Sequence, residues 1–163
     1  MNRFIAAIVA FVAITPAHGA SDPAKAKGIV NQVCAACHGV DGNSPLSANP
    51  SLAGQHPEYL LKQLTEFKSG ARGNPVMTGM VANLSPDDMR SLAAYYSVQT
   101  PKQMGAKDKD LVAQGRKLYR GGNPSNSVAA CAGCHAPNGS GIPTQYPRLA
   151  GQHADYIAAQ LKA

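Results

Sequence analysis

The sequence has no tryptophan, only three phenylalanines and six tyrosines among its 163 residues. The length suits one ordinary domain or two small ones, and 44% of the residues are hydrophobic. Small domains bury a smaller share of their surface than large ones and are marginally stable on their own. With so few aromatic side chains, two small cores would need added apolar surface, such as a buried prosthetic group.

Long apolar runs are also lacking. The run from Phe4 to Ile14 follows the positive charge of Arg3 and is much shorter than the roughly 20 residues that span a bilayer. Ala17 and Gly19 supply the small residues of a cleavage site. We therefore predict an export signal over residues 1–19 and a periplasmic mature protein, in an oxidising compartment.

Cysteine is limited to four residues, and all four fall into two copies of one motif. Two thiols three residues apart, followed directly by histidine, are typical of covalent haem attachment. The thiols add to the vinyl groups of the porphyrin, and the histidine reaches the iron. The sequence predicts two haem c groups, held by Cys34, Cys37, Cys131 and Cys134, with His38 and His135 as axial iron ligands.

Two other uses of the cysteines stay open. In an oxidising compartment they could form disulfides or a redox dithiol, and paired C-x-x-C motifs can bind zinc. The histidine in both copies and the lack of an alternating strand and helix pattern favour haem over a dithiol. The spacing of 97 residues between the motifs exceeds the usual spacing of zinc ligands.

Acidic residues are fewer than basic ones, and the net charge is +6. Residues 20–98 hold six basic and six acidic side chains, whereas residues 99–163 hold eight and three. Each haem would add two propionates and reduce the excess. We therefore expect no nucleic-acid partner.

Helix signals occur along the whole chain and predict an all-α fold. Asp22-Pro23 opens a helix toward Cys34, Pro57 opens one that stops at Gly70, Ser85-Pro86 opens a third, and a fourth runs from about Asp110 to Tyr119. Residues 71–83 are rich in turn signals, and we predict a loop there.

The halves repeat at an offset of 97 residues. Pro50-Ser51-Leu52-Ala53-Gly54-Gln55-His56 is matched by Pro147-Arg148-Leu149-Ala150-Gly151-Gln152-His153. We predict two domains, at residues 20–98 and 110–163, joined by a linker at 99–109. Gly115 precedes its motif by ten residues more than Gly28 does, which indicates an insertion in the second domain.

The sixth ligand of the first iron has three candidates, Met77, Met80 and His56. A soft thioether favours reduced iron and raises its potential, as an electron-transfer centre requires. His56 is the weaker candidate because it lies just before Pro57 at a helix start, where capping or propionate binding is the ordinary role.

The chain resembles the cytochrome c4 family, which has two class I cytochrome c domains. The resemblance rests on both C-x-x-C-H motifs, both Pro-x-Leu-Ala-Gly-Gln segments, Met77-Thr78-Gly79-Met80 and Leu92-Ala93-Ala94-Tyr95-Tyr96. It implies that Met77 is the ligand, with Met80 as the fallback. It also implies that the carbonyls of Pro50 and Pro147 accept hydrogen bonds from His38 and His135.

The chain departs from the family near its end. Adding 97 to Met77 gives position 174, beyond residue 163, so the methionine of the second haem is not present. We expect the second domain to be incomplete and the sequence to be a truncated form of a longer product. If it is complete, the second haem is five-coordinate or takes a substitute such as His153.

The resemblance implies an electron carrier and not an enzyme, with no small-molecule substrate. The expected partners are membrane-bound respiratory complexes, a cytochrome bc-type donor and a terminal cytochrome c oxidase as acceptor, met in transient contacts. Peripheral association with the membrane is compatible with this role. The alternatives are a two-haem peroxidase or a gas-binding sensor with an open second haem.

Overall fold

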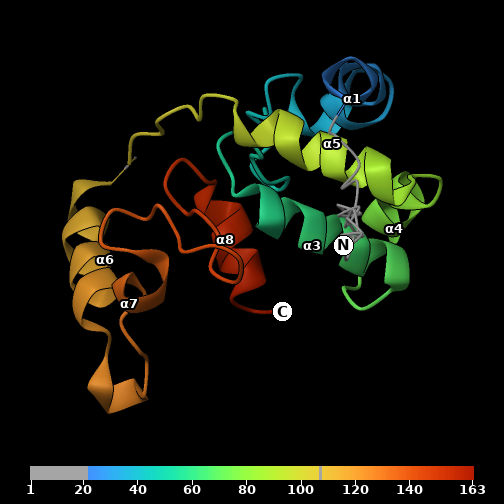
Figure 1. Ribbon diagram of the computed structural model, residues 1–163. Coiled ribbons are helices and arrows are strands. Elements are labelled where there is room, and N and C mark those ends of the chain that lie inside the picture. The colour runs from blue at the N-terminus through green and yellow to red at the C-terminus, as the bar shows by residue number, and fades with distance from the viewer. Residues whose placement is uncertain (1–21, 107) are drawn as a thin grey trace, which may run out of the picture.

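The computed structural model describes residues 22–106 and 108–163, so the predicted export signal at 1–19 lies outside the described residues. The fold is all-helical, as the sequence predicts (Figure 1). Within the described ranges, β-structure is limited to two isolated bridges. In this part of the chain, no helix combines the length and the apolar character needed to cross a membrane.

The first domain is built of helices, and two of them begin at side-chain caps that the sequence predicts. The helices are α1 (Pro23–Ile29), the π-helical turn η1 (Val30–Cys34), α2 (Ala35–His38), α3 (Pro57–Ser69), α4 (Pro75–Val81) and α5 (Pro86–Ser97). The Asp22 carboxylate accepts hydrogen bonds from the backbone N–H groups of Ala24 and Lys25 at 3.0 Å. From Pro23 the chain stays helical to His38, which brings the first attachment motif in on one continuous element.

The expected ends of α3 and α5 are confirmed. Gly70 ends α3 with a left-handed φ of +81°, a conformation that glycine adopts without strain. Ser85 and Asp88 form a capping box at the start of α5, in which each side chain bonds the backbone N–H of the other. The Lys25 ammonium and these Ser85 hydrogen bonds hold the pKa of Asp88 at about 2, which ties α1 to α5.

The prediction of a loop over residues 71–83 is wrong, because α4 lies within it. The Asn74 side chain accepts a hydrogen bond from Met77 N at 3.0 Å, and Pro75 supplies the first helical position. The glycines around this cap dominate the turn signal in the sequence. As a result, Met77 and Met80 lie three residues apart on a helix.

The core of the molecule belongs to the first domain. Helix α5 packs against both α1 and α3, and α4 packs against α3. The apolar cluster at their contact is made of buried side chains from α3, α4, α5, the turn η1 and the loop before α5, and Ile29 of α1 packs against it. Its members are Val30, Leu60, Phe67, Val81, Leu84, Met89, Leu92, Ala93 and Tyr96. Met89 is therefore a core residue, as its helical spacing indicates.

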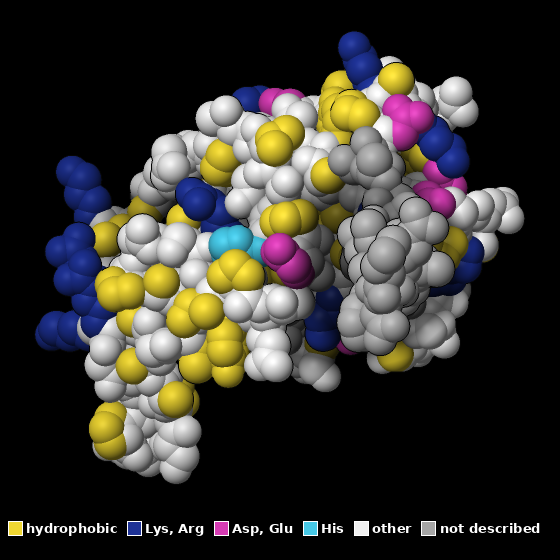
Figure 2. Space-filling model, viewed as in Figure 1, with side chains coloured by type: hydrophobic (Ala, Val, Ile, Leu, Met, Phe, Trp, Pro, Cys, Tyr) yellow, Lys and Arg dark blue, Asp and Glu magenta, His cyan; other side chains and the backbone are white. Residues whose placement is uncertain are grey.

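The second domain has helices but no buried apolar core. It comprises α6 (Lys109–Gly121), η2 (Pro124–Asn126), α7 (Ala132–His135) and α8 (Ala154–Gln160). Within residues 108–163, no side chain is buried, and Leu111 on α6 is 62% exposed. The predicted insertion forms the loop between α6 and α7, which projects from the molecule (Figure 1). Basic side chains gather over α6 (Figure 2).

The sequence repeat is also a structural repeat. The carbonyl of Gly42 accepts hydrogen bonds from the N–H groups of Leu52 and Ala53. At the same offset, the carbonyl of Gly139 accepts from the N–H groups of Leu149 and Ala150. The loop after each histidine therefore closes in the same way, which places the two repeated Pro-x-Leu-Ala-Gly-Gln segments alike.

The linker passes between the domains and packs against both. A Cβ on Gly54 would lie 2.9 Å from the Pro101 ring, and one on Gly151 would lie 2.9 Å from the carbonyl of Lys102. These two glycines are equivalent in the repeat. The linker therefore requires small residues at both positions and helps to set how the domains meet.

One position of the repeat is strained in the second domain, because Gly39 has φ +76° and its counterpart Ala136 has φ +65°. A non-glycine residue with a positive φ is strained by on the order of 1 kcal/mol or more. We expect Ala136→Gly to stabilise the protein by about 1 kcal/mol, measured by thermal unfolding. Gly39→Ala should do the opposite, since its Cβ would lie 2.7 Å from the carbonyl of Asn43. A lower melting temperature for Ala136→Gly would contradict this account.

Candidate functional site

The first attachment motif presents two thiols and one imidazole at the end of a helix. Cys34 is half-buried, Cys37 is exposed, and both thiols are free. His38 is only 7% exposed. Its Nδ1 lies 2.8 Å from the Pro50 carbonyl oxygen, the contact that the family resemblance implies.

This contact determines which nitrogen of His38 can bind a metal. A carbonyl oxygen only accepts, so Nδ1 carries the proton and Nε2 keeps its lone pair. Burial lowers the pKa of His38, although the bond to Pro50 opposes this effect. The neutral imidazole is therefore favoured, and it is the form that coordinates iron.

The two methionine candidates lie on the same helix, α4, but differ in burial. Met77 is partly buried and packs against the core cluster, whereas the side chain of Met80 is 47% exposed. Leu52 and Leu64 also pack against that cluster while remaining partly exposed. These apolar side chains suit contact with a porphyrin, and Met77 is the methionine on their side of the helix.

The second motif repeats this arrangement in a more open setting. Cys131 and Cys134 are free, and His135 Nδ1 lies 2.9 Å from the Pro147 carbonyl oxygen. The ring of Tyr146 meets the His135 ring edge-on, with centroids 5.9 Å apart. His135 is only half-buried here.

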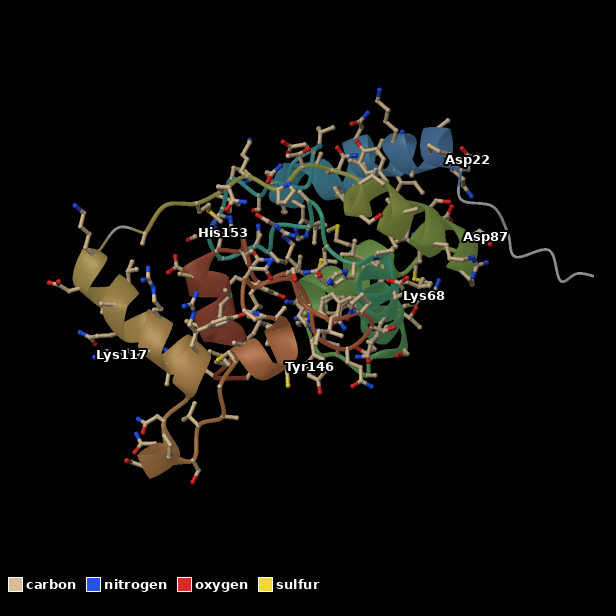
Figure 3. The ribbon with its side chains drawn as sticks, turned by 60° about the vertical axis from the view of Figure 1, so that its left-hand side comes forward. Asp22, Lys68, Asp87, Lys117, Tyr146 and His153 are labelled. Carbon is tan, nitrogen blue, oxygen red and sulfur yellow. The ribbon has the colours of Figure 1, made fainter. Side chains whose placement is uncertain are left out.

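His56 does not have the capping role that the sequence suggested for it. Neither its side chain nor that of His153 caps the helix that follows. Instead, His56 Nε2 lies 2.9 Å from the carbonyl of Ser140, and His153 Nε2 lies 3.0 Å from that of Ser44. Figure 3 shows His153 at the start of α8, beside the first domain. Both histidines therefore join the two domains.

The donor set of each motif fits a haem c group. Two free thiols are in place for thioether bonds, and a histidine with its Nδ1 bonded to a carbonyl offers Nε2 to iron. Burial also raises the pKa of the Cys34 thiol. Within residues 22–106 and 108–163, no group of three or more His, Cys, Asp or Glu side chains is placed to hold a metal ion.

Comparison with known proteins agrees with this geometry. The family model described as Cytochrome c matches residues 23–97 and 112–163. The cytochrome c4 of Azotobacter vinelandii is 46% identical to this chain, over 99% of the chain and 81% of that protein. The chain belongs to the cytochrome c4 family. It is therefore an electron carrier and not an enzyme, as the sequence resemblance implies.

A solved cytochrome c4 has the same fold. The crystal structure of reduced recombinant cytochrome c4 from Pseudomonas stutzeri superposes with a TM-score of 0.80 at 47% identity. It covers 88% of this chain, and this chain covers 80% of it. The cytochrome c4 of Pseudomonas aeruginosa is 45% identical over 99% of this chain and 80% of that protein. The two tandem domains are thus a family property.

Sequence reasoning missed the residues that join the two domains. Gln55, Gln152 and Arg72 all make polar contacts across the interface. Gln55 and Gln152 are recognisable in the sequence as the repeated glutamine that ends each Pro-x-Leu-Ala-Gly-Gln segment. Nothing in the chain order indicated that each would reach into the opposite domain.

Proposed function

We propose that this protein is exported to the periplasm, carries two covalently bound haem c groups and passes electrons between respiratory membrane complexes. The donor would be a cytochrome bc-type complex and the acceptor a terminal cytochrome c oxidase. The observation that carries the proposal is the duplicated set of two free thiols and one imidazole, each imidazole held by a proline carbonyl.

The chain's residues would have separate tasks. Cys34 and Cys37 hold the first porphyrin through thioether bonds, and Cys131 and Cys134 hold the second. The Pro50 and Pro147 carbonyls orient the rings of His38 and His135 toward iron. Met77 would supply the sixth ligand of the first iron. When bound, haem would supply a one-electron couple.

The charges favour brief, oriented encounters with partners. The basic side chains on α6 are exposed, among them Arg116, Lys117 and Arg120 (Figure 2). The first domain has equal numbers of acidic and basic residues after position 19. A one-sided charge distribution speeds and orients association without making it tight, which suits a carrier that must dissociate after each transfer.

The haem count tests the first part of the proposal. We expect two haems per chain that stay attached after acid extraction, and one fewer in each of Cys34→Ser/Cys37→Ser and Cys131→Ser/Cys134→Ser. The optical spectrum of the full-length holoprotein, with and without carbon monoxide, separates the function classes. Two low-spin haems indifferent to carbon monoxide support the carrier. A high-spin haem that binds it would favour a peroxidase or gas sensor.

Electron-transfer kinetics test the partners. The reduced protein should donate to a terminal oxidase in membranes, and the oxidised protein should accept from a bc-type complex. Both rates should fall as salt is raised, because screening weakens the attraction between exposed charges. Lys117→Glu should slow the rate with whichever partner meets α6. Rates that are slow at every salt concentration would argue against these partners.

A further inference from the structure

Two glutamines at equivalent positions of the repeat cross the domain interface in opposite directions. Gln152 Oε1 accepts from Ser51 N at 2.9 Å, and its Nε2 donates to the Ser51 carbonyl at 2.9 Å. Gln55 Oε1 accepts from Arg148 N at 2.8 Å, and its Nε2 donates to the Arg148 carbonyl at 3.1 Å. Ser51 and Arg148 are themselves equivalent at the offset of 97. The four contacts therefore form a two-fold arrangement.

Each glutamine bonds to the peptide group that also holds an axial histidine. Ser51 N–H and the Pro50 carbonyl belong to one planar peptide group. That group accepts from His38 Nδ1 at 2.8 Å on one side and donates to Gln152 on the other. In the second domain, the peptide group of Pro147 and Arg148 joins His135 to Gln55 in the same way.

The orientation of both side-chain amides follows from their partners. Gln152 Oε1 also accepts from His153 N at 3.0 Å, and Gln55 Oε1 from His56 N at 3.0 Å. Each position receives two backbone N–H groups, so it must be the oxygen and not the nitrogen of the amide.

These bonds lie in a closely packed region. Gln55 is 6% exposed, and Gln152 is half-buried. The cavity beside the two amides measures about 10 Å³, at the lower limit for a single water molecule. With little water to screen them, hydrogen bonds in series strengthen one another, by about 10–30% per bond.

We propose that Gln152 tunes the reduction potential of the first haem and that Gln55 tunes that of the second. A peptide group whose N–H donates a hydrogen bond becomes a better acceptor at its carbonyl oxygen. This strengthens the hydrogen bond that the histidine Nδ1–H donates to that oxygen. A histidine whose Nδ1–H donates a stronger hydrogen bond gives more electron density to iron and stabilises the oxidised iron. This assignment rests on the proposed function, in which His38 and His135 are the iron ligands.

Each glutamine acts on the haem of the opposite domain. The reduction potential of each haem therefore depends on contact between the domains, and docking of the domains lowers both potentials. Any partner that separates the domains would raise them. The glutamines are positioning residues, since they act on the iron only through a peptide group and a histidine.

The test is a redox titration of both haems in the intact holoprotein with Gln152→Leu or Gln55→Leu. Leucine has a similar volume but cannot accept a hydrogen bond. For Gln152→Leu we expect a two- to threefold change in the oxidised-to-reduced ratio of the first haem at fixed ambient potential. That change is a rise of about 18–28 mV at about 59 mV per tenfold. The second haem should move much less, and Gln55→Leu should reverse the pattern.

A matched control separates tuning from a loosened interface. Gln160 also reaches across the domains, to Arg72, but it does not touch either proline peptide group. Gln160→Leu should leave both potentials unchanged. Equal shifts of both haems in Gln152→Leu, or a shift confined to the second haem, would overturn the proposal.

A second measurement reports the strength of the hydrogen bond from His38 Nδ1–H to the Pro50 carbonyl. In proton NMR of the reduced protein, the His38 Nδ1–H signal should move upfield in Gln152→Leu. It should stay or move downfield in Gln152→Glu, whose carboxylate still accepts from Ser51 N–H. An Nδ1–H signal that is the same in the wild type and both variants overturns the tuning. Two attached haems with unmoved potentials refute this inference alone, whereas a wild type without two haems refutes the proposed function as well.

Discussion

Met77→Ala is expected to lower the reduction potential of the first haem by about 0.1–0.3 V, within the roughly 0.8 V that axial ligands span. Loss of the thioether removes the soft ligand that favours reduced iron. Met77 is partly buried against the core cluster at the first turn of α4, where Asn74 fixes its backbone. A redox titration of the holoprotein and its optical spectrum would measure the change.

Met80→Ala is the matched control, because the same side chain is removed from the same helix. Met80 is 47% exposed and lies three residues from Met77. We expect it to leave the potential and the low-spin spectrum of the first haem nearly unchanged. A large shift in Met80→Ala with none in Met77→Ala would exchange the two roles, and the carrier function would stand.

Leu92→Ala is expected to destabilise the first domain by about 3 kcal/mol, within the range of about 2–5 kcal/mol for such core substitutions. Leu92 is 2% exposed on α5, the helix that packs against both α1 and α3. Its removal would leave a cavity that the neighbouring helices cannot easily fill. Urea unfolding of the holoprotein, followed by circular dichroism, would measure the loss.

Leu111→Ala makes the same chemical change on a surface. Leu111 is 62% exposed on α6, and surface substitutions usually alter stability by no more than about 0.5 kcal/mol. If Leu92→Ala cost as little as Leu111→Ala, the packing of α5 against its neighbours would have to be different.

The helix ends were predictable because their causes are local. The caps at Asp22 and Ser85 bond to backbone groups within one turn, so their signals lie within a few adjacent residues. The same reasoning missed α4, although Asn74-Pro75 is a cap of the same kind. Glycines on both sides of that cap favoured a loop in the sequence, whereas packing of the helix against α3 stabilises it in the structure.

The contact of each histidine with a proline carbonyl was implied by the family resemblance, and it is also local in the chain. Twelve residues separate His38 from Pro50 and His135 from Pro147, and each pair is joined by one glycine-containing loop. The role of His56 could not be predicted from the sequence. Its partner, the carbonyl of Ser140, is 84 residues away and belongs to the other domain.

The order of the residues is enough to locate the two attachment motifs, their repeat at 97 residues and the family, because these depend on spacing along the chain. It does not show which side chains meet when two similar domains dock. Gln152 reaches Ser51 across 101 residues, and Gln55 reaches Arg148 across 93. These contacts need the register between domains, which the linker at Pro101 and the two-fold arrangement of the loops establish in space.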